Sequence, residues 1–227
     1  VFMIPKPDQR TVSEPKTWSY ILAGFRFISR EKVVLGAISL DMFAVLLGGA
    51  VALMPIFASE ILVLGPFGLG LLRAAPGVGA IAMAVYLAAF PIKHHSGMTM
   101  FAGVAVFGLG TLVFGLSETT WLSIVALAVM GAGDMISVYV RETLIALWTP
   151  DAVRGRVNAV NSVFIGASNE LGETRAGFMA WGFGAVPAVV IGGLGTLAVS
   201  IAWAGLFPSL RKIDTLEAPT EAERARL

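Results

Sequence analysis

The sequence has no cysteine, only two histidines and few charged residues, and each shortage excludes a class of protein. Without cysteine, the chain has no disulfide, no thiolate metal ligand and no cysteine nucleophile. His94 and His95 are adjacent and no His-Glu-x-x-His motif occurs, so the sequence predicts no metal site and no cofactor. The 16 lysines and arginines nearly balance the 15 aspartates and glutamates, which argues against a nucleic-acid-binding protein.

Hydrophobic residues are present in excess. They make up 56% of the chain, the mean hydropathy is +0.81, and only 14% of the residues are charged. A soluble domain carries about 25% charged residues, which cover its surface. Many of the 26 glycines and 11 prolines lie within apolar runs, as is common in transmembrane helices. The composition therefore predicts an all-α membrane protein.

Six apolar runs are long enough to cross a bilayer, which takes roughly 20 mainly apolar residues in a helix. The predicted transmembrane helices are Val34–Phe57, Pro66–Phe90, Met98–Leu116, Trp121–Trp148, Val157–Trp181 and Val186–Phe207. The short segments between them contain glycine, proline or charged residues. The sequence therefore predicts a six-helix transmembrane domain at residues 34–207, with a linker at 1–33 and a tail at 208–227.

The linker carries apolar residues at helical spacing, with Arg26 and Arg30 between them. The apolar residues are Trp18, Ile21, Leu22, Phe25 and Ile28. The pattern favours a short amphipathic helix lying on the membrane surface, and the alternative is an ordinary soluble linker helix. Because a basic, proline-containing segment precedes the first predicted span, we expect the chain to come from the middle of a longer polypeptide. We expect the tail to be solvated.

Basic residues gather on one side of the predicted membrane domain. When the segments are assigned to alternate sides, one side receives Arg26, Arg30, Lys32, Lys93, Arg154, Arg156, Arg211 and Lys212. The opposite side receives only Glu60 and Glu118. By the positive-inside rule, this asymmetry predicts a multi-pass protein of the inner (plasma) membrane with both termini in the cytoplasm.

The most specific motif joins the fourth and fifth predicted spans on the cytoplasmic side. It contains Pro150, which ends a helix, followed by Arg154, Gly155 and Arg156. The two arginines are suited to pair with phosphates or with the carbonyl ends of neighbouring helices. The alternative is that their charges only set the topology, although topology does not explain the Pro-x-x-x-Arg-Gly-Arg order.

With this motif, the sequence resembles the second half of the major facilitator superfamily, and it is similar to the drug:proton antiporter branch that includes a siderophore exporter. The supporting segments are Leu40–Val45, Leu72–Ala80, Gly133–Ser137 with Arg141, and Phe164–Gly172. The resemblance implies a six-helix half of a twelve-helix bundle, built as a 3+3 inverted repeat. The dipeptides Asp41-Met42 and Asp134-Met135, in spans one and four, are weak evidence for that repeat.

One loop departs from the family pattern. The loop between the second and third helices usually carries Gly-x-x-x-Asp-Arg/Lys-x-Gly-Arg, and here residues 89–97 keep a basic residue and the last glycine but no acid. The ion pair that the family builds at this loop is therefore not expected in this half. We expect it in the missing N-terminal half.

Eight charged residues fall within the predicted spans: Asp41, Arg73, Asp134, Arg141, Glu142, Glu170, Glu173 and Arg175. A charge at mid-membrane costs at least about 2.5–3.5 kcal/mol, so these side chains should face the bundle interior or a wet cavity. Asp41 and Arg141 each lie about 10 Å from the cytoplasmic end of their helix. Equal depth and opposite charge predict an ion pair between spans one and four.

Carboxylates near the midplane are candidates for carrying protons. Glu170 and Glu173 share one helix face, and two close carboxylates disfavour each other's ionisation. Glu173 is close in sequence to Arg175 and level with Arg73, which suits a structural ion pair. We therefore expect Glu170, near the depth of Asp134, to carry the proton. The alternative for each residue is a structural ion pair or hydrogen bond.

The sequence as a whole predicts half of a secondary transporter that exports a small amphipathic molecule, a drug or a siderophore, in exchange for protons. Its expected partners are membrane lipid, the missing N-terminal six-helix half, the substrate and protons. An intramembrane enzyme would need a Ser–His dyad or a metal set within the spans, and no catalytic residue is expected. A six-helix channel or scaffold subunit without proton coupling remains the alternative.

Overall fold

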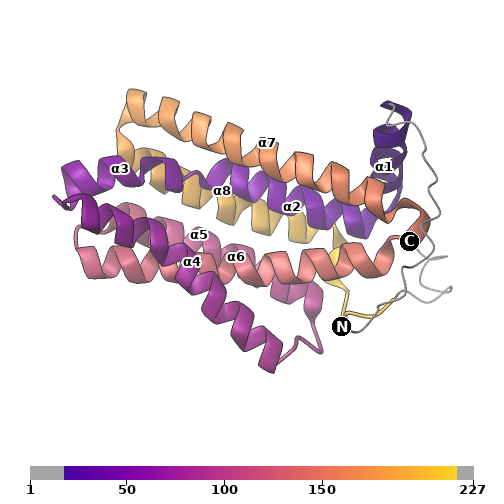
Figure 1. Cartoon of the computed structure of the whole chain (residues 1–227). Helices are drawn as coiled ribbons and strands as arrows, with labels where there is room; N and C mark the ends of the chain where they lie inside the picture. The colour runs from indigo at the N-terminus through magenta and orange to yellow at the C-terminus, as the bar shows by residue number, and fades with distance from the viewer. Residues whose placement is uncertain (1–17, 219–227) are drawn as a thin grey trace, which may run out of the picture.

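The computed structural model describes residues 18–218, which form a bundle of long helices with no strand in that range (Figure 1). The helices are α1 (Trp18–Arg30), α2 (Lys32–Gly48), α3 (Met54–Ile56), α4 (Pro66–Ala89), α5 (Ser96–Leu116), α6 (Thr120–Trp148), α7 (Asp151–Phe183), α8 (Ala185–Leu206) and α9 (Pro208–Arg211). A 3₁₀ turn, η1 (Val51–Leu53), precedes α3, and a π-helix, η2 (Phe57–Ile61), follows it.

Five of the six predicted spans correspond to segments of the described chain that are long and apolar enough to cross a membrane. These are Lys32–Ile61, Pro66–Ala89, Ser96–Leu116, Thr120–Trp148 and Ala185–Leu206. The fifth predicted span falls in α7, which has 33 residues but does not reach the apolar level of the others. Polar side chains such as Asn161, Asn169, Glu170 and Glu173 lower its hydropathy. Nevertheless α7 runs alongside α2 over much of the bundle (Figure 1).

The first predicted span is interrupted rather than continuous. Helix α2 ends at Gly48, and Gly49 adopts a left-handed conformation with φ +50°. This conformation favours glycine, which has no Cβ to clash with the backbone. The chain then continues through η1, α3 and η2 to Ile61. The prediction of one regular helix at Val34–Phe57 is therefore wrong at Gly49.

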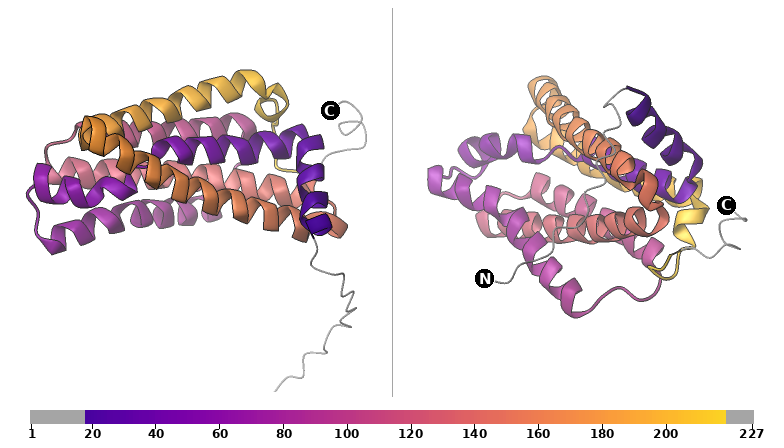
Figure 2. Two further views of the ribbon diagram at one scale, coloured as in Figure 1. Left: turned by 90° about the horizontal axis from the view of Figure 1, so that it is seen from above. Right: turned by 45° about the vertical axis from the view of Figure 1, so that its right-hand side comes forward.

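The helices differ in how far their neighbours surround them. Helix α5 packs between α6 and α8, and α2 packs on α7 and α8. Helix α4 packs mainly on α6, and its buried residues are Leu72, Ala75, Gly79 and Leu87. A broad face of α4 and one of α7 consequently remain open (Figure 2).

Two hydrophobic clusters fill the interior. One, around Ile28, Leu40 and Leu144, lies at the end of the bundle that carries α1 and α9, which we call the α1 end (Figure 1). The other contains Phe57 and Phe114, whose ring centroids are 4.5 Å apart, and lies at the opposite end, called the α3 end.

Helix α1 runs across the direction of the long helices at one end of the bundle (Figure 1). It packs against α7, where a Cβ at Gly24 would lie 2.7 Å from the carbonyl oxygen of Arg156. Ile28 is buried, whereas Leu22 and Phe25 are exposed. A helix thus lies within the predicted linker at 1–33, whose residues 1–17 lie outside the described part of the chain.

Candidate functional site

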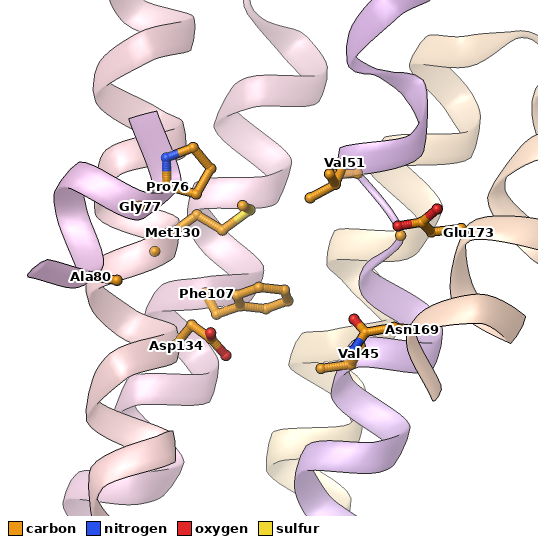
Figure 3. A pocket seen from close by; sticks show the side chains of 13 residues that line it. Val45, Val51, Pro76, Gly77, Ala80, Phe107, Met130, Asp134, Asn169 and Glu173 are labelled. Carbon is orange, nitrogen blue, oxygen red and sulfur yellow. The ribbon is translucent and has the colours of Figure 1, made fainter. Parts of the chain in front are cut away.

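A cavity of about 360 Å³ opens between two pairs of helices, α4 with α6 and α2 with α7. Its lining residues are Val45, Gly49, Ala50, Val51, Pro76, Gly77, Ala80, Phe107, Met130, Gly131, Asp134, Asn169 and Glu173. Figure 3 shows Asp134, Phe107 and Met130 on one wall and Val45, Asn169 and Glu173 on the other. The interruption of α2 supplies Gly49, Ala50 and Val51 to this cavity.

The cavity holds two carboxylates and no basic side chain among its lining residues. Asp134 of α6 forms no hydrogen bond or ion pair with any residue from 18 to 218. Glu173 of α7 lies on the opposite wall and is exposed. Two acids facing a largely apolar cavity can bind protons or a cationic group, because an unpaired charge is costly at a partly buried side chain such as Asp134.

Glu170 lies outside this cavity. Its side chain is exposed, and its backbone carbonyl accepts a 2.7 Å hydrogen bond from the Thr174 hydroxyl. The residues of α7 that line the cavity are Asn169 and Glu173. Of the two carboxylates singled out on α7, it is therefore Glu173 that shares a cavity with Asp134.

The expected ion pair of Glu173 with Arg175 or Arg73 is wrong. The Arg175 guanidinium donates through Nε to the carbonyl oxygen of Leu46 at 3.0 Å and through Nη2 to that of Leu47. Arg73 is exposed on α4. Within residues 18–218, neither arginine forms an ion pair with Glu173. Residues two apart on a helix point in different directions, so their closeness in sequence did not imply a contact.

The predicted ion pair between Asp41 and Arg141 is confirmed. Arg141 Nη1 contacts Asp41 Oδ2, joining α6 to α2, and the side chains are only 4% and 8% exposed. Arg141 Nε also lies 3.3 Å from Glu142 Oε1, which accepts a 3.1 Å hydrogen bond from Asn161 of α7. The network thus ties three helices together near the α1 end.

A second, much smaller cavity lies between Asp134 and this ion pair. Its volume is about 10 Å³, and its polar lining residues are Asp41, Asp134 and Ser137. A cavity of roughly this size is the least that holds one water molecule. Asp134 lines both cavities, so it stands between the larger cavity and the buried ion pair.

The Pro-x-x-x-Arg-Gly-Arg motif, predicted as a cytoplasmic loop between the fourth and fifth spans, is mostly helical, so the prediction of a loop is wrong. Pro150 directly precedes α7, and Arg154, Gly155 and Arg156 lie in its first turns. Arg154 Nη1 lies 2.7 Å from Asp151 Oδ1, and Nη2 donates to the Thr149 carbonyl at 3.3 Å. Arg154 thus bridges the end of α6 and the start of α7, in agreement with its expected pairing with helix carbonyls.

The loop between α4 and α5, which lacks the acidic residue of the family pattern, is bound by a carboxylate from the tail. Asp214, which follows α9, accepts a 2.8 Å hydrogen bond from the His95 backbone N–H, and its other oxygen lies 3.1 Å from His94 Nδ1. These two bonds, the backbone bond first, lower the pKa of the Asp214 carboxyl below its usual 3.8. The Ser96 and Gly97 amides donate to the carbonyls of Asp214 and Ile213. The expectation of a wholly solvated tail is therefore wrong for this segment.

No group of three or more histidine, aspartate or glutamate side chains in the described residues is placed to hold a metal ion.

Comparison with known proteins identifies a matching family and several relatives. Residues 5–226 match a family described as transmembrane secretion effector. Among the relatives are enterobactin exporters from Citrobacter koseri, 28% identical over 213 residues, and from Escherichia coli, 26% identical over 199 residues. The alignments cover 89% and 88% of this chain but 44% and 43% of those proteins. The chain therefore spans less than half the length of these relatives.

Proposed function

Because this chain belongs to the transmembrane secretion effector family of the major facilitator superfamily, we propose that it forms the C-terminal half of a proton-coupled efflux transporter. The family is one of membrane transporters rather than of enzymes. The cargo of the proposed transporter is a small amphipathic molecule, a drug or a siderophore, by analogy with relatives named for enterobactin export. The membrane is the inner (plasma) membrane, with the α1 end in the cytoplasm.

The observation that carries this proposal is the cavity shared by Asp134 and Glu173. Apolar and aromatic side chains, among them Phe107 and Met130, provide most of its wall and suit an amphipathic substrate. The two carboxylates supply sites for protons in a region where ionised groups are costly. One cavity therefore offers contacts for both the substrate and the coupling ion, as exchange requires.

The open faces of α4 and α7 support the assignment as one half of a larger bundle. On α7, polar side chains are exposed at Asn158, Ser162, Asn169, Glu170, Glu173 and Thr174. Such a face is unfavourable against lipid tails and is suited to a water-filled pathway or to a second helical domain. A further six-helix half placed against α4 and α7 would close the cavity from its open side.

The water-sized cavity below Asp134 offers a route for protons. A proton on Asp134 is separated from the Asp41–Arg141 pair by that small cavity. In this proposal Asp134 exchanges protons with water that enters from the α1 end. The charged pair of Asp41 and Arg141 polarises the water on this route.

The test is Asp134→Asn in the whole transporter, with Glu118→Gln as the control. Glu118 is exposed between α5 and α6, so its substitution makes the same carboxylate-to-amide change away from the cavity. Efflux of ethidium and of enterobactin is measured in cells with and without a proton gradient. Asp134→Asn should abolish the proton-driven component, and the control should keep it. Efflux that needs no gradient in either form would favour a channel without proton coupling.

A further inference from the structure

The interruption of α2 exposes backbone carbonyls inside the bundle. Helix α2 ends at Gly48, and the last carbonyls of a helix have no partner within the helix. In a membrane, a carbonyl without a hydrogen-bond partner is strongly unfavourable, so another group has to bind it. The segment that follows, Gly49 to Val51, lines the cavity.

Arg175 of α7 supplies those partners. Its Nε and Nη2 donate to the carbonyl oxygens of Leu46 and Leu47, respectively. A guanidinium carries several N–H groups in a rigid plane, so a single side chain can bind two adjacent carbonyls. A Cβ at Gly49 would lie 3.2 Å from Arg175 Nη2, so the bound guanidinium lies close to the residue at which the chain turns.

Glycines let the neighbouring helices approach the same point. A Cβ at Gly172 of α7 would lie 2.8 Å from the Val45 carbonyl oxygen. A Cβ at Gly192 of α8 would lie 2.6 Å from that of Leu47. The end of α2 is thus held closely by α7 and α8, while the following turn borders open space in the cavity.

We propose that Arg175 is a positioning residue that fixes the turn at Gly49–Val51 and transmits movements of α7 to it. Glu173 lines the cavity from the same helix, two residues before Arg175. In this proposal, a proton or substrate at Glu173 that moves the α7 backbone carries Arg175, and with it the end of α2. This inference rests on the proposed function only where it names a proton or substrate as the cause of the movement. The hydrogen bonds by which Arg175 fixes the turn do not depend on the proposed function.

The absence of cysteine allows a direct test in the expressed chain. Val51→Cys places one thiol on the turn, at a position 47% exposed. Its rate of modification by N-ethylmaleimide is measured in isolated membranes, first alone and then combined with Arg175→Gln. Loss of the hydrogen bonds from a charged donor should raise the rate roughly tenfold. Arg175→Lys, which keeps the charge but not the planar group, should give an intermediate rate.

Thr196→Val is the matched control. The Thr196 hydroxyl donates to the Ala44 carbonyl at 3.0 Å, so it ties α8 to α2 below the interruption. This isosteric change removes a buried bond to the same helix and should leave labelling of Val51→Cys unchanged. Val63→Cys, in the exposed segment before α4, reports any general loosening.

Equal labelling of Val51→Cys with and without Arg175→Gln would overturn the proposal, and so would an equal increase at Val51 and Val63. If neither Arg175 variant yields folded protein, Arg175 is a requirement for assembly and the local role is also rejected. The measurement needs neither substrate nor a proton gradient. It therefore gives the same answer whether or not the proposed efflux function holds.

Discussion

Asp134 of α6 and Glu173 of α7 face one cavity from opposite walls (Figure 3). The two helices that carry them make few contacts with each other, since α6 packs mainly on α4 and α5 while α7 packs on α2 and α8. If the group of α4, α5 and α6 moved relative to the group of α2, α7 and α8, the separation of the two carboxylates would change. Two ionised acids repel each other more strongly as they approach, so the repulsion between Asp134 and Glu173 depends on how far apart α6 and α7 lie.

The first prediction separates the two carboxylates of α7. In the whole transporter, Glu173→Gln should lower proton-driven efflux on the order of tenfold or more, because Glu173 lines the cavity. Glu170→Gln is the control, since that side chain is exposed and outside the cavity. Efflux of ethidium under an imposed proton gradient measures both. Loss of coupling in the Glu170 variant alone would restore Glu170 as the proton carrier.

The second prediction concerns the ion pair between α2 and α6. Asp41→Asn or Arg141→Gln alone leaves a buried charge without its partner, which costs about 3–5 kcal/mol. The double variant should recover part of that loss. Thermal stability in detergent, measured for the four proteins of the cycle, gives the coupling energy. Strictly additive losses would mean that the two side chains do not interact in the membrane.

The sequence allowed this ion pair to be predicted because depth in a membrane follows from position along a helix. Asp41 and Arg141 have opposite charges at equal depth, and few other partners exist in so apolar a region. Most helix boundaries were also predictable, because glycine, proline and charged residues separate the apolar runs. The end of α2 at Gly48 and the start of α7 at Asp151 were not. Composition and depth thus predict the helices and one buried contact.

The contacts of Arg175 could not be predicted in the same way. Its partners are backbone carbonyls that become available only because the chain turns at Gly49, and glycine is common in transmembrane helices without any turn. The role of Asp214 was hidden because it lies in a polar tail and binds a loop far away in the sequence. The partners of Arg175 and one of the two partners of Asp214 are main-chain groups, which carry no signature in the residue type.

The third prediction tests the close approach of α4 and α6. A Cβ at Gly131 would collide with the Pro76 carbonyl group, whereas a Cβ at Gly77, on the cavity, would meet nothing within 4 Å. Gly131→Ala should therefore destabilise the protein by about 1–3 kcal/mol, while Gly77→Ala should be neutral or slightly stabilising. Thermal unfolding in detergent compares the two. Equal effects would mean that the helices are less closely packed.

The fourth prediction concerns topology. His95 and Glu118 are exposed and lie in loops at opposite ends of α5, so His95→Cys and Glu118→Cys give suitable single thiols. The basic residues near His95 predict that it faces the cytoplasm. A membrane-impermeant maleimide added to intact cells should modify Glu118→Cys and leave His95→Cys unmodified. The reverse result would invert the orientation of the whole domain.

The fifth prediction concerns the contact between Asp214 and the α4–α5 loop. The pKa of the Asp214 carboxyl is lowered in the folded protein, so this contact stabilises the segment above the ordinary pKa of 3.8. The stabilisation should disappear as the pH falls through the lowered pKa, because the protonated acid no longer accepts the two bonds as an anion. At neutral pH, Asp214→Asn should reproduce that loss.

Hydrogen exchange measures this contact directly, since the Ser96 and Gly97 amides are bound by the carbonyls of Asp214 and Ile213. Their exchange should accelerate in Asp214→Asn at neutral pH, after correction for the intrinsic rate. Asp151→Asn provides the control, because Asp151 is also an exposed acid at the same end, paired with Arg154. Unchanged protection of Ser96 and Gly97 in Asp214→Asn would show that the backbone bonds hold the segment without the carboxylate.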